Sequence, residues 1–286
     1  MAFDKNSNQF TFIFAIVLVV VVGTLLAVTY LGLKPEHDEN VRREKMQNIL
    51  ASLKIEVERD AAPGKFEEMI ESSLLIDAKG RTVDGSVWTK GDKPEANAAF
   101  GMDVLKQFKD WKAGLVKESD LKYPVYKASK DGRSVYVLPL VGTGLWGPIW
   151  GYVSIVDDGR TIYGSTFDHK GETPGLGAEI SLPIFEEPFE GKTITDESGT
   201  FKGITVYKGG SQTTDPHGVD GISGGTITSQ GVDEMLKRLL AVYDQYLKTQ
   251  VAALAVPATP DTLGVDSLRT DSILVDSTQT ASLITP

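Results

Sequence analysis

Glycine and hydroxyl-bearing residues are concentrated between Asp215 and Gly231, in the sequence DPHGVDGISGGTITSQG, which leads into an amphipathic helical pattern. Backbone N–H groups at the start of a helix, together with the helix dipole, bind anions such as phosphate. An ordinary glycine loop in front of a capped helix has the same composition, and the residues alone leave both interpretations open. Additional hydroxyl donors for a phosphate would come from Ser223, Thr226, Thr228 and Ser229.

The loop lacks the marks of two common phosphate-binding patterns, the Gly-Lys-Ser/Thr end of a Walker A loop and the glycine spacing of a dinucleotide-binding unit. The chain has no cysteine, which excludes disulfides, thiolate zinc sites and iron–sulfur ligation. His169 and His217, with Asp168 and Asp215, resemble a metal site only weakly, and we expect no metal there. With 29 Lys and Arg against 39 Asp and Glu, the net charge is −10 and argues against a nucleic-acid partner.

The segment from Asp220 to Ser229, DGISGGTITS, resembles the flavinylation motif of the FMN-binding domain family, usually Asp-Gly-x-Ser/Thr-Gly-Ala-Thr. In that family the closing threonine carries FMN through a phosphodiester bond, so the resemblance implies covalent FMN on Thr226. Gly225 stands where alanine is usual, and the missing methyl group should loosen the loop without preventing attachment. Two further motifs of the family occur in its order, GLWG at 144–147 and ETPGLG at 172–177.

The resemblance implies a set of residues around the cofactor. A threonine hydroxyl is a weak nucleophile and must be exposed to a partner enzyme, here a flavin transferase that would take FMN from FAD. Trp146 and Leu176 are candidates for an apolar cover of the flavin ring, although they also fit a core aromatic at a hairpin and a buried loop anchor. Thr173-Pro174-Gly175 alone is a common turn. The chain needs no catalytic residue, and the implied cofactor-binding residues are Trp146, Thr173, Leu176, Gly177, Ser223, Gly224, Gly225, Thr226 and Thr228.

An apolar run from Phe10 to Leu33 contains no charged residue. As a helix it would be about 36 Å long, enough to cross a hydrocarbon core of about 30 Å. A cleaved signal peptide has a shorter apolar core and a small-residue cleavage site, so we predict a single-pass membrane anchor. The charges on both flanks are mixed, and they do not decide on which side of the membrane the remaining chain lies.

The rest of the chain predicts an α+β fold, an antiparallel sheet flanked by helices and preceded by the N-terminal transmembrane helix. Helices are expected over 41–58, 104–115 and 230–250, and Thr228 or Ser229 would cap the last of them. The segment 62–123 predicts only weak strands and short helices. The four β-rich runs that would form the sheet are 133–141, 149–156, 161–168 and 201–207.

The C-terminal segment 256–286 is rich in Ser, Thr and Asp. Four aspartates spaced by five residues suggest a pentapeptide β-helix, but such stacks need more repeats to bury a core, and we favour a disordered acidic tail. The predicted organisation is a short flank over 1–9, a transmembrane helix over 10–33, an FMN-binding domain with a charged neck over 34–255, and this tail.

The anchor and the long segment before the sheet extend the resemblance, over about residues 1–250, to the C subunits of the Na+-translocating NADH:quinone oxidoreductases (Nqr). It implies an electron-transfer subunit with covalent FMN in a complex that oxidises NADH, reduces quinone and exports Na+. Two alternatives remain open. The G subunit of the Rnf complex shares the motifs but is typically shorter before the sheet, and a membrane-tethered sensory module would hold an anionic ligand non-covalently.

The same resemblance implies the surroundings of the chain. The partners would be the membrane, the A, B, D, E and F subunits of Nqr, and the flavin transferase. The location would be the bacterial inner membrane, with the large domain in the periplasm. The sequence contains no recognisable NADH site, so we expect no complete activity from the isolated chain.

Overall fold

A six-stranded antiparallel sheet forms the centre of the domain in this computed structural model, which describes residues 7–210 and 213–255. The strand order is β2-β1-β3-β4-β5-β6, so each of the last four strands lies beside its neighbour in the sequence. The strands are β1 (Ile70–Ile76), β2 (Trp88–Thr89), β3 (Tyr123–Lys130), β4 (Arg133–Thr143), β5 (Pro148–Val156) and β6 (Ile162–His169).

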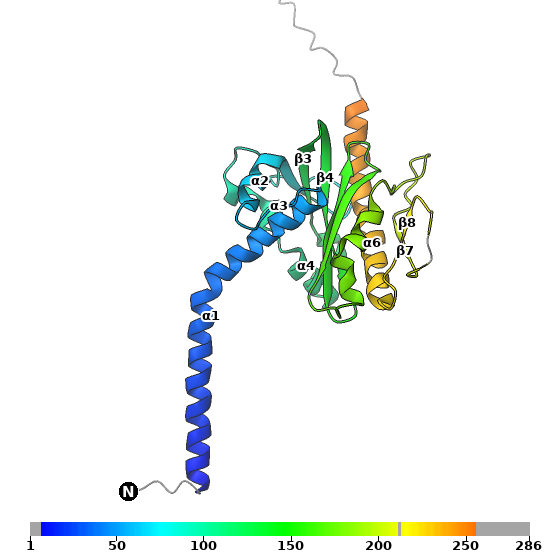
Figure 1. Ribbon diagram of the computed structural model, residues 1–286. Coiled ribbons are helices and arrows are strands. Elements are labelled where there is room, and N and C mark those ends of the chain that lie inside the picture. Colours follow the sequence, from blue (N-terminus) through cyan, green and yellow to red (C-terminus); the bar gives the residue numbers. More distant parts are fainter. Residues whose placement is uncertain (1–6, 211–212, 256–286) are drawn as a thin grey trace, which may run out of the picture.

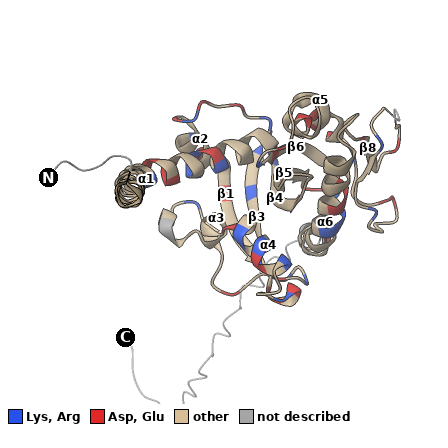
Figure 2. Ribbon diagram, turned by 90° about the horizontal axis from the view of Figure 1, so that it is seen from below, with Lys and Arg blue, Asp and Glu red and all other residues tan. Residues whose placement is uncertain are grey.

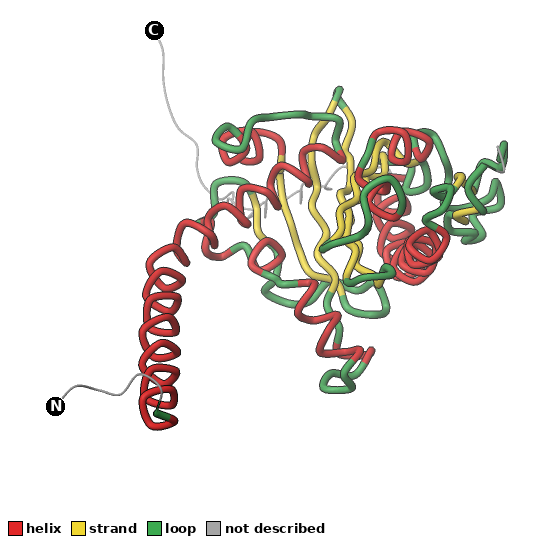
Figure 3. The backbone as a smooth tube through the Cα atoms, turned by 60° about the horizontal axis from the view of Figure 1, so that its bottom comes forward, coloured by secondary structure: helices red, strands yellow, loops and turns green. Residues whose placement is uncertain are grey.

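Helices cover both faces of this sheet (Figures 1 and 3). The C-terminal part of α1 and the short α2 and α3 lie on one face, and α6 runs along the other. The α-helices are α1 (Asn8–Ser52), α2 (Ala62–Met69), α3 (Ala98–Gly101), α4 (Val104–Lys112), α5 (Pro183–Glu186) and α6 (Thr226–Ala255). Short 3-10 helices are η1 (Pro94–Ala96), η2 (Glu118–Asp120), η3 (Gly177–Ser181) and η4 (Glu187–Phe189).

The central strand β4 is buried on both faces, and its side chains alternate between two apolar clusters as a strand requires. Val135 and Val137 pack in the cluster that contains Ile49 and Leu50 of α1. Alternate residues of β4 pack in the cluster that contains much of α6; these are Tyr136, Leu138 and Leu140 from the strand and Leu236, Leu240 and Tyr243 from the helix. The predicted α+β fold with an antiparallel sheet is confirmed.

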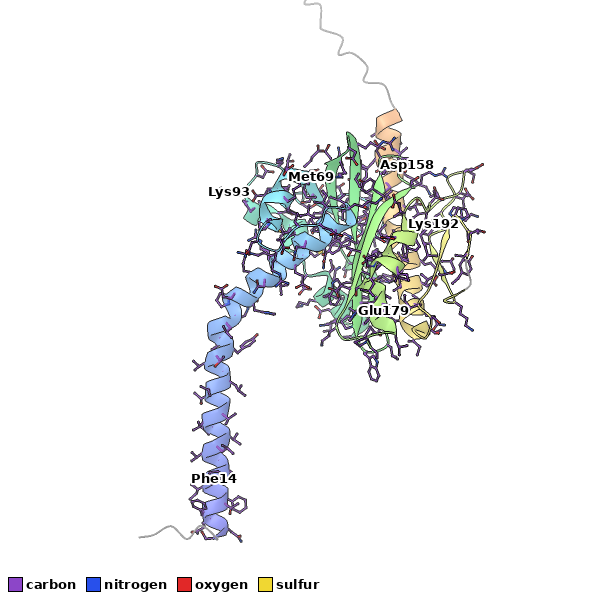
Figure 4. All side chains as sticks on the ribbon, viewed as in Figure 1. Phe14, Met69, Lys93, Asp158, Glu179 and Lys192 are labelled. Carbon is purple, nitrogen blue, oxygen red and sulfur yellow. The ribbon has the colours of Figure 1, made fainter. Side chains whose placement is uncertain are left out.

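Helix α1 has 45 residues, and it is the one helix in the described part of the chain that is long and apolar enough to cross a membrane. Its apolar part projects away from the domain, and the side chain of Phe14 has no other element beside it (Figure 4). Pro35 lies inside the helix, where it removes a backbone hydrogen bond and favours a kink. Figure 1 shows the resulting change of direction between the apolar part and the part packed on the domain.

Four predicted elements need correction. The charged neck and the predicted helix 41–58 are the continuation of α1, which ends at Ser52 because Lys54 adopts a left-handed conformation. The predicted strand 201–207 is wrong in extent and in partner, because Gly203 has a positive φ and only Thr205–Tyr207 (β7) forms a strand. It pairs in parallel with β8 (Gly218–Asp220) in a separate small sheet.

The third correction concerns the last helix, which begins at Thr226 and ends at Ala255 rather than covering 230–250. The predicted helix 104–115 ends earlier, at Lys112. Positively and negatively charged residues are interspersed along the helices and loops of the ribbon in Figure 2. The predicted tail, residues 256–286, lies outside the described residues.

Candidate functional site

Three loops meet at the start of α6, and each contains one of the three motifs recognised in the sequence. They are the turn between β4 and β5 with Trp146, the segment 172–177 before η3, and the loop 221–225 that precedes the helix. The Trp146 backbone N–H donates to Glu172 Oε1 at 2.8 Å, and the Thr228 hydroxyl donates to Glu172 Oε2 at 2.6 Å. The fold therefore brings together residues that lie 26 and 56 positions apart in the sequence.

Thr226 is the first residue of α6 and is exposed. Gly224 has a φ of +78°, a backbone conformation that residues other than glycine rarely adopt. The Gly225 N–H donates to the Ile222 carbonyl at 3.0 Å. Ser229 Oγ accepts from the Ile222 N–H at 2.9 Å and ties the loop to the helix. The first N–H groups of a helix have no partner within it, so this end can receive an anion.

Large apolar side chains surround this polar end and are exposed to solvent. Trp146 is 69% exposed and Leu176 is 42% exposed, so the interpretations of Trp146 as a core aromatic and of Leu176 as a buried anchor are wrong. A Cβ at Gly224 would lie 2.8 Å from Leu176 Cδ2, which places Leu176 against the loop. Leu145 and Ile227 are also exposed. An apolar surface beside an anion site is what a flavin with its phosphate requires.

The segment 172–177 approaches the loop 221–225 and the start of α6 closely at two glycines. A Cβ at Gly177 would collide with Thr228 Oγ1, and a Cβ at Gly225 would lie 3.2 Å from the Gly177 nitrogen. The segment from Thr173 to Gly175 forms the turn that its composition indicates, because the Thr173 carbonyl accepts from the Leu176 N–H at 3.1 Å. The loosening of the loop by the missing methyl group at Gly225 stays a prediction. The backbone around Gly225 is closely packed.

Neither predicted cap serves as a cap. Thr228 and Ser229 lie within the first turn of α6, and both are buried. The hydroxyl of Thr228 donates a hydrogen bond to Glu172, and that of Ser229 accepts one from the Ile222 N–H in the loop. The apolar stripe used to find this helix becomes continuous only at Val232, which is why the sequence placed its start too late.

Glu172 is the site residue that the sequence analysis missed. It opens the ETPGLG motif, but no role was predicted for its side chain. Its side chain is 4% exposed and both of its oxygens accept a hydrogen bond. Its own N–H donates to His169 Nδ1 at 3.1 Å. The motif glycines Gly144 and Gly177 could have indicated a buried side chain nearby, because a residue without a Cβ lets such a group approach the backbone.

His169, at the end of β6, and His217, in the loop before β8, each form a hydrogen bond with the backbone. His217 Nδ1 lies 2.5 Å from the Thr193 carbonyl oxygen, and His169 Nδ1 accepts from Glu172. Within residues 7–210 and 213–255, no group of three or more His, Asp and Glu side chains is placed to hold a metal ion.

The three motifs and most of the chain are similar to those of known proteins. The FMN-binding domain family matches residues 144–241, which include all three motifs. The C subunit of the Na(+)-translocating NADH-quinone reductase of Vibrio anguillarum is 31% identical over 232 residues, covering 81% of this chain and 90% of the relative. Its counterpart in Neisseria meningitidis MC58 is 32% identical, covering 80% and 88%. The chain belongs to the family of the C subunits of Na(+)-translocating NADH-quinone reductases.

Solved structures of this family share the fold. The crystal structure of the C subunit of the Na(+)-translocating NADH-quinone reductase from Parabacteroides distasonis has 43% sequence identity and a TM-score of 0.63, covering 75% of this chain and 96% of that one. The Shewanella oneidensis NqrC structure has 25% identity and a TM-score of 0.57, covering 74% and 98%. The predicted resemblance to the Nqr C subunits is confirmed. The chain is part of a multi-subunit oxidoreductase and contains an FMN-binding domain, and its apolar helix associates it with the membrane.

Proposed function

We propose that this protein carries FMN covalently, as a phosphodiester on Thr226, and relays electrons in a complex that oxidises NADH, reduces quinone and exports Na+. The observation that carries the proposal is the exposed Thr226 at the start of α6, where the three motifs meet. The residues present fit the cofactor, because the helix start suits a phosphodiester anion and the exposed apolar side chains suit an aromatic ring.

Attachment requires a partner enzyme. The Thr226 hydroxyl oxygen forms a bond to the FMN phosphorus of FAD, the pyrophosphate bond breaks, AMP leaves, and the hydroxyl proton passes to the flavin transferase. An exposed hydroxyl on a rigid helix start meets the need for access and orientation. Gly224 and Gly225 supply the tight backbone that presents it, and Ser223 is an exposed hydroxyl beside it.

The other predicted residues have distinct places in this proposal. Trp146 and Leu176 supply apolar surface for the ring, and the backbone of Thr173 and Gly177 lies close to that surface. Thr228 is 1% exposed and its hydroxyl is used by Glu172, so we place it behind the phosphodiester rather than in contact with it.

FMN, when bound, supplies one-electron transfer, and the protein supplies its position and surroundings. A single flavin site suits a relay between neighbouring subunits, for which we propose the A, B, D, E and F subunits of Nqr. The complex would be a Na+-translocating enzyme of the bacterial inner membrane, with this domain in the periplasm. The isolated chain would not oxidise NADH.

The test is replacement of one hydroxyl. Thr226→Ala should abolish covalent flavin, measured as flavin fluorescence of the band in a denaturing gel and as the FMN mass on the tryptic peptide. Ser223→Ala removes an exposed hydroxyl from the same loop and should keep the flavin. Covalent flavin retained by Thr226→Ala would refute the attachment site. Flavin that leaves the parent chain in detergent would favour the non-covalent sensory module.

A further inference from the structure

The buried carboxylate of Glu172 has no part in the attachment chemistry, yet it lies where the three loops of the site meet. We propose that Glu172 is a positioning residue for the flavin site: its two oxygens hold the Trp146 turn and the first turn of α6 in one fixed arrangement. This inference rests on the proposed role of Thr226, and it assigns to Glu172 the orientation of the attachment threonine against the surface that covers the ring.

Glu172 makes one hydrogen bond to the Trp146 turn and one to the first turn of α6. Oε1 accepts the backbone N–H of Trp146 at 2.8 Å, and Oε2 accepts the hydroxyl of Thr228 at 2.6 Å. A buried carboxyl group is costly unless its oxygens are hydrogen-bonded. The side chain is 4% exposed, so water does not replace these partners easily. Loss of either partner therefore carries a larger penalty than loss of a surface hydrogen bond.

Two motif glycines give independent evidence that the backbone is built around this carboxylate. A Cβ at Gly144 would lie 2.6 Å from Glu172 Oε1, and a Cβ at Gly177 would lie 2.6 Å from Glu172 Oε2. Contacts shorter than 3.0 Å are not found for real Cβ atoms. A side chain at either position would collide with the carboxylate, and at Gly177 it would collide with its partner Thr228 Oγ1 as well, so a glycine in each of two motifs leaves the room that this hydrogen-bonded group occupies.

The geometry explains how Glu172 acts on Thr226 without touching it. Thr228 follows Thr226 by two residues in the same helical turn, so fixing the Thr228 hydroxyl fixes the rotation of the helix start. On the other side, Trp146 is 69% exposed, so packing of its ring does not hold the turn. The hydrogen bond from its backbone N–H to Glu172 supplies that restraint.

The test separates hydrogen bonding from charge and from folding in the full-length chain. Glu172→Ala removes both contacts and Thr228→Val removes one. Glu172→Gln keeps both, because its amide oxygen can accept from Trp146 while its NH2 group donates to the Thr228 oxygen. Thr228→Ser also keeps the hydroxyl. Three readouts apply: the initial rate of flavin attachment with FAD and a flavin transferase, the visible circular dichroism of the attached flavin, and hydrogen exchange of the Trp146 amide without flavin.

We expect Glu172→Ala and Thr228→Val to slow attachment by about tenfold, which corresponds to loss of roughly one buried hydrogen bond. Both variants should weaken the visible dichroism of the flavin, since its ring is no longer held in one orientation. Glu172→Ala should also speed exchange of the Trp146 amide. Glu172→Gln and Thr228→Ser should restore all readouts to within about twofold of the parent.

Glu179, labelled in Figure 4, provides a matched control. Its carboxylate accepts the Gly175 N–H at 2.9 Å within its own segment. Glu179→Ala should behave as the parent. Parent-like attachment and dichroism in Glu172→Ala would overturn the positioning role, and so would a Glu172→Gln variant as impaired as Glu172→Ala. If Glu172→Ala does not fold, Thr228→Val decides. A parent chain that never gains covalent flavin would instead refute the role of Thr226, while the Trp146 exchange would still test the restraint.

Discussion

The hydroxyl of Thr226 differs from the other hydroxyls in the first turn of α6 because it remains accessible. Thr228 and Ser229 are buried, and each of their hydroxyls already has a partner in the protein. In the proposed attachment, a transferase that needs a free, oriented nucleophile would therefore find one threonine in this turn. Its selectivity would follow from what the neighbouring hydroxyls are bound to, rather than from a special property of Thr226 itself.

A carboxylate away from the site, Asp77 in the turn after β1, stabilises the fold through its charge. The Arg81 guanidinium and the backbone N–H groups of Arg81 and Lys79 donate to Asp77, and they lower the pKa of its carboxyl to about 2. Because the folded pKa lies below the unfolded value of about 3.9, this stabilisation is complete above that value and is lost as the pH falls toward 2. Asp77→Asn should therefore lower the melting temperature at pH 7.

The control for Asp77→Asn is pH itself. In the detergent-solubilised chain, the difference in melting temperature between Asp77→Asn and the parent should narrow at about pH 2.5, because the carboxyl of the unfolded parent is then largely protonated and unfolding is favoured by proton uptake, while the folded carboxyl is still mostly ionised. A difference that is the same at both pH values would show that the stabilisation comes from shape or neutral hydrogen bonds and not from the carboxylate.

At the scale of elements, α6 approaches the end of β4 without an intervening side chain. A Cβ at Gly231 would collide with the Thr143 carbonyl oxygen. Gly231→Ala should push the helix away from the strand and destabilise the fold by about 1–3 kcal/mol, as overpacking does. Because Thr143 precedes the Trp146 turn, the same change should reduce covalent flavin. Thermal unfolding and gel fluorescence measure the two effects.

The matched control is Gly64→Ala in α2. Nothing lies within 4 Å of a Cβ at Gly64, and alanine favours a helix by about 1 kcal/mol over glycine. This variant should be neutral or more stable, with parent-like flavin content. Equal destabilisation by both substitutions would mean that the close contact between α6 and β4 is not the cause.

The sequence predicts the main sheet well where apolar and β-branched residues are dense. The strands β4, β5 and β6 lie within two residues of their predicted limits. The prediction fails for 201–207, because a three-residue strand paired in parallel with β8 depends on contacts that no local pattern contains. It also fails to assign Glu172, whose burial comes from a partner 56 residues away at Thr228. Motifs identify which loops form the site, whereas the tertiary contacts decide which residues hold it.

At the scale of the whole molecule, the candidate flavin site and the apolar helix lie on the same side of the domain. The start of α6 lies at the end of the domain toward which the apolar part of α1 extends, and α6 runs away from it (Figure 1). With α1 crossing the bilayer, Thr226 would face the membrane surface. A short distance to membrane-embedded partner subunits is what an electron relay needs, and the same geometry predicts that Thr226 and the large domain share one side of the membrane.

The side of the membrane can be measured because the chain contains no cysteine. Glu197 lies in an exposed turn of the large domain, and Asn8 is exposed at the opposite end of the apolar helix. With the domain in the periplasm, Glu197→Cys should react with an impermeant maleimide in intact spheroplasts, whereas Asn8→Cys should react only after the membrane is opened by detergent. Covalent flavin in both variants shows that they fold. The reverse labelling pattern would place the domain in the cytoplasm, and labelling of both positions in sealed spheroplasts would show that α1 does not cross the membrane.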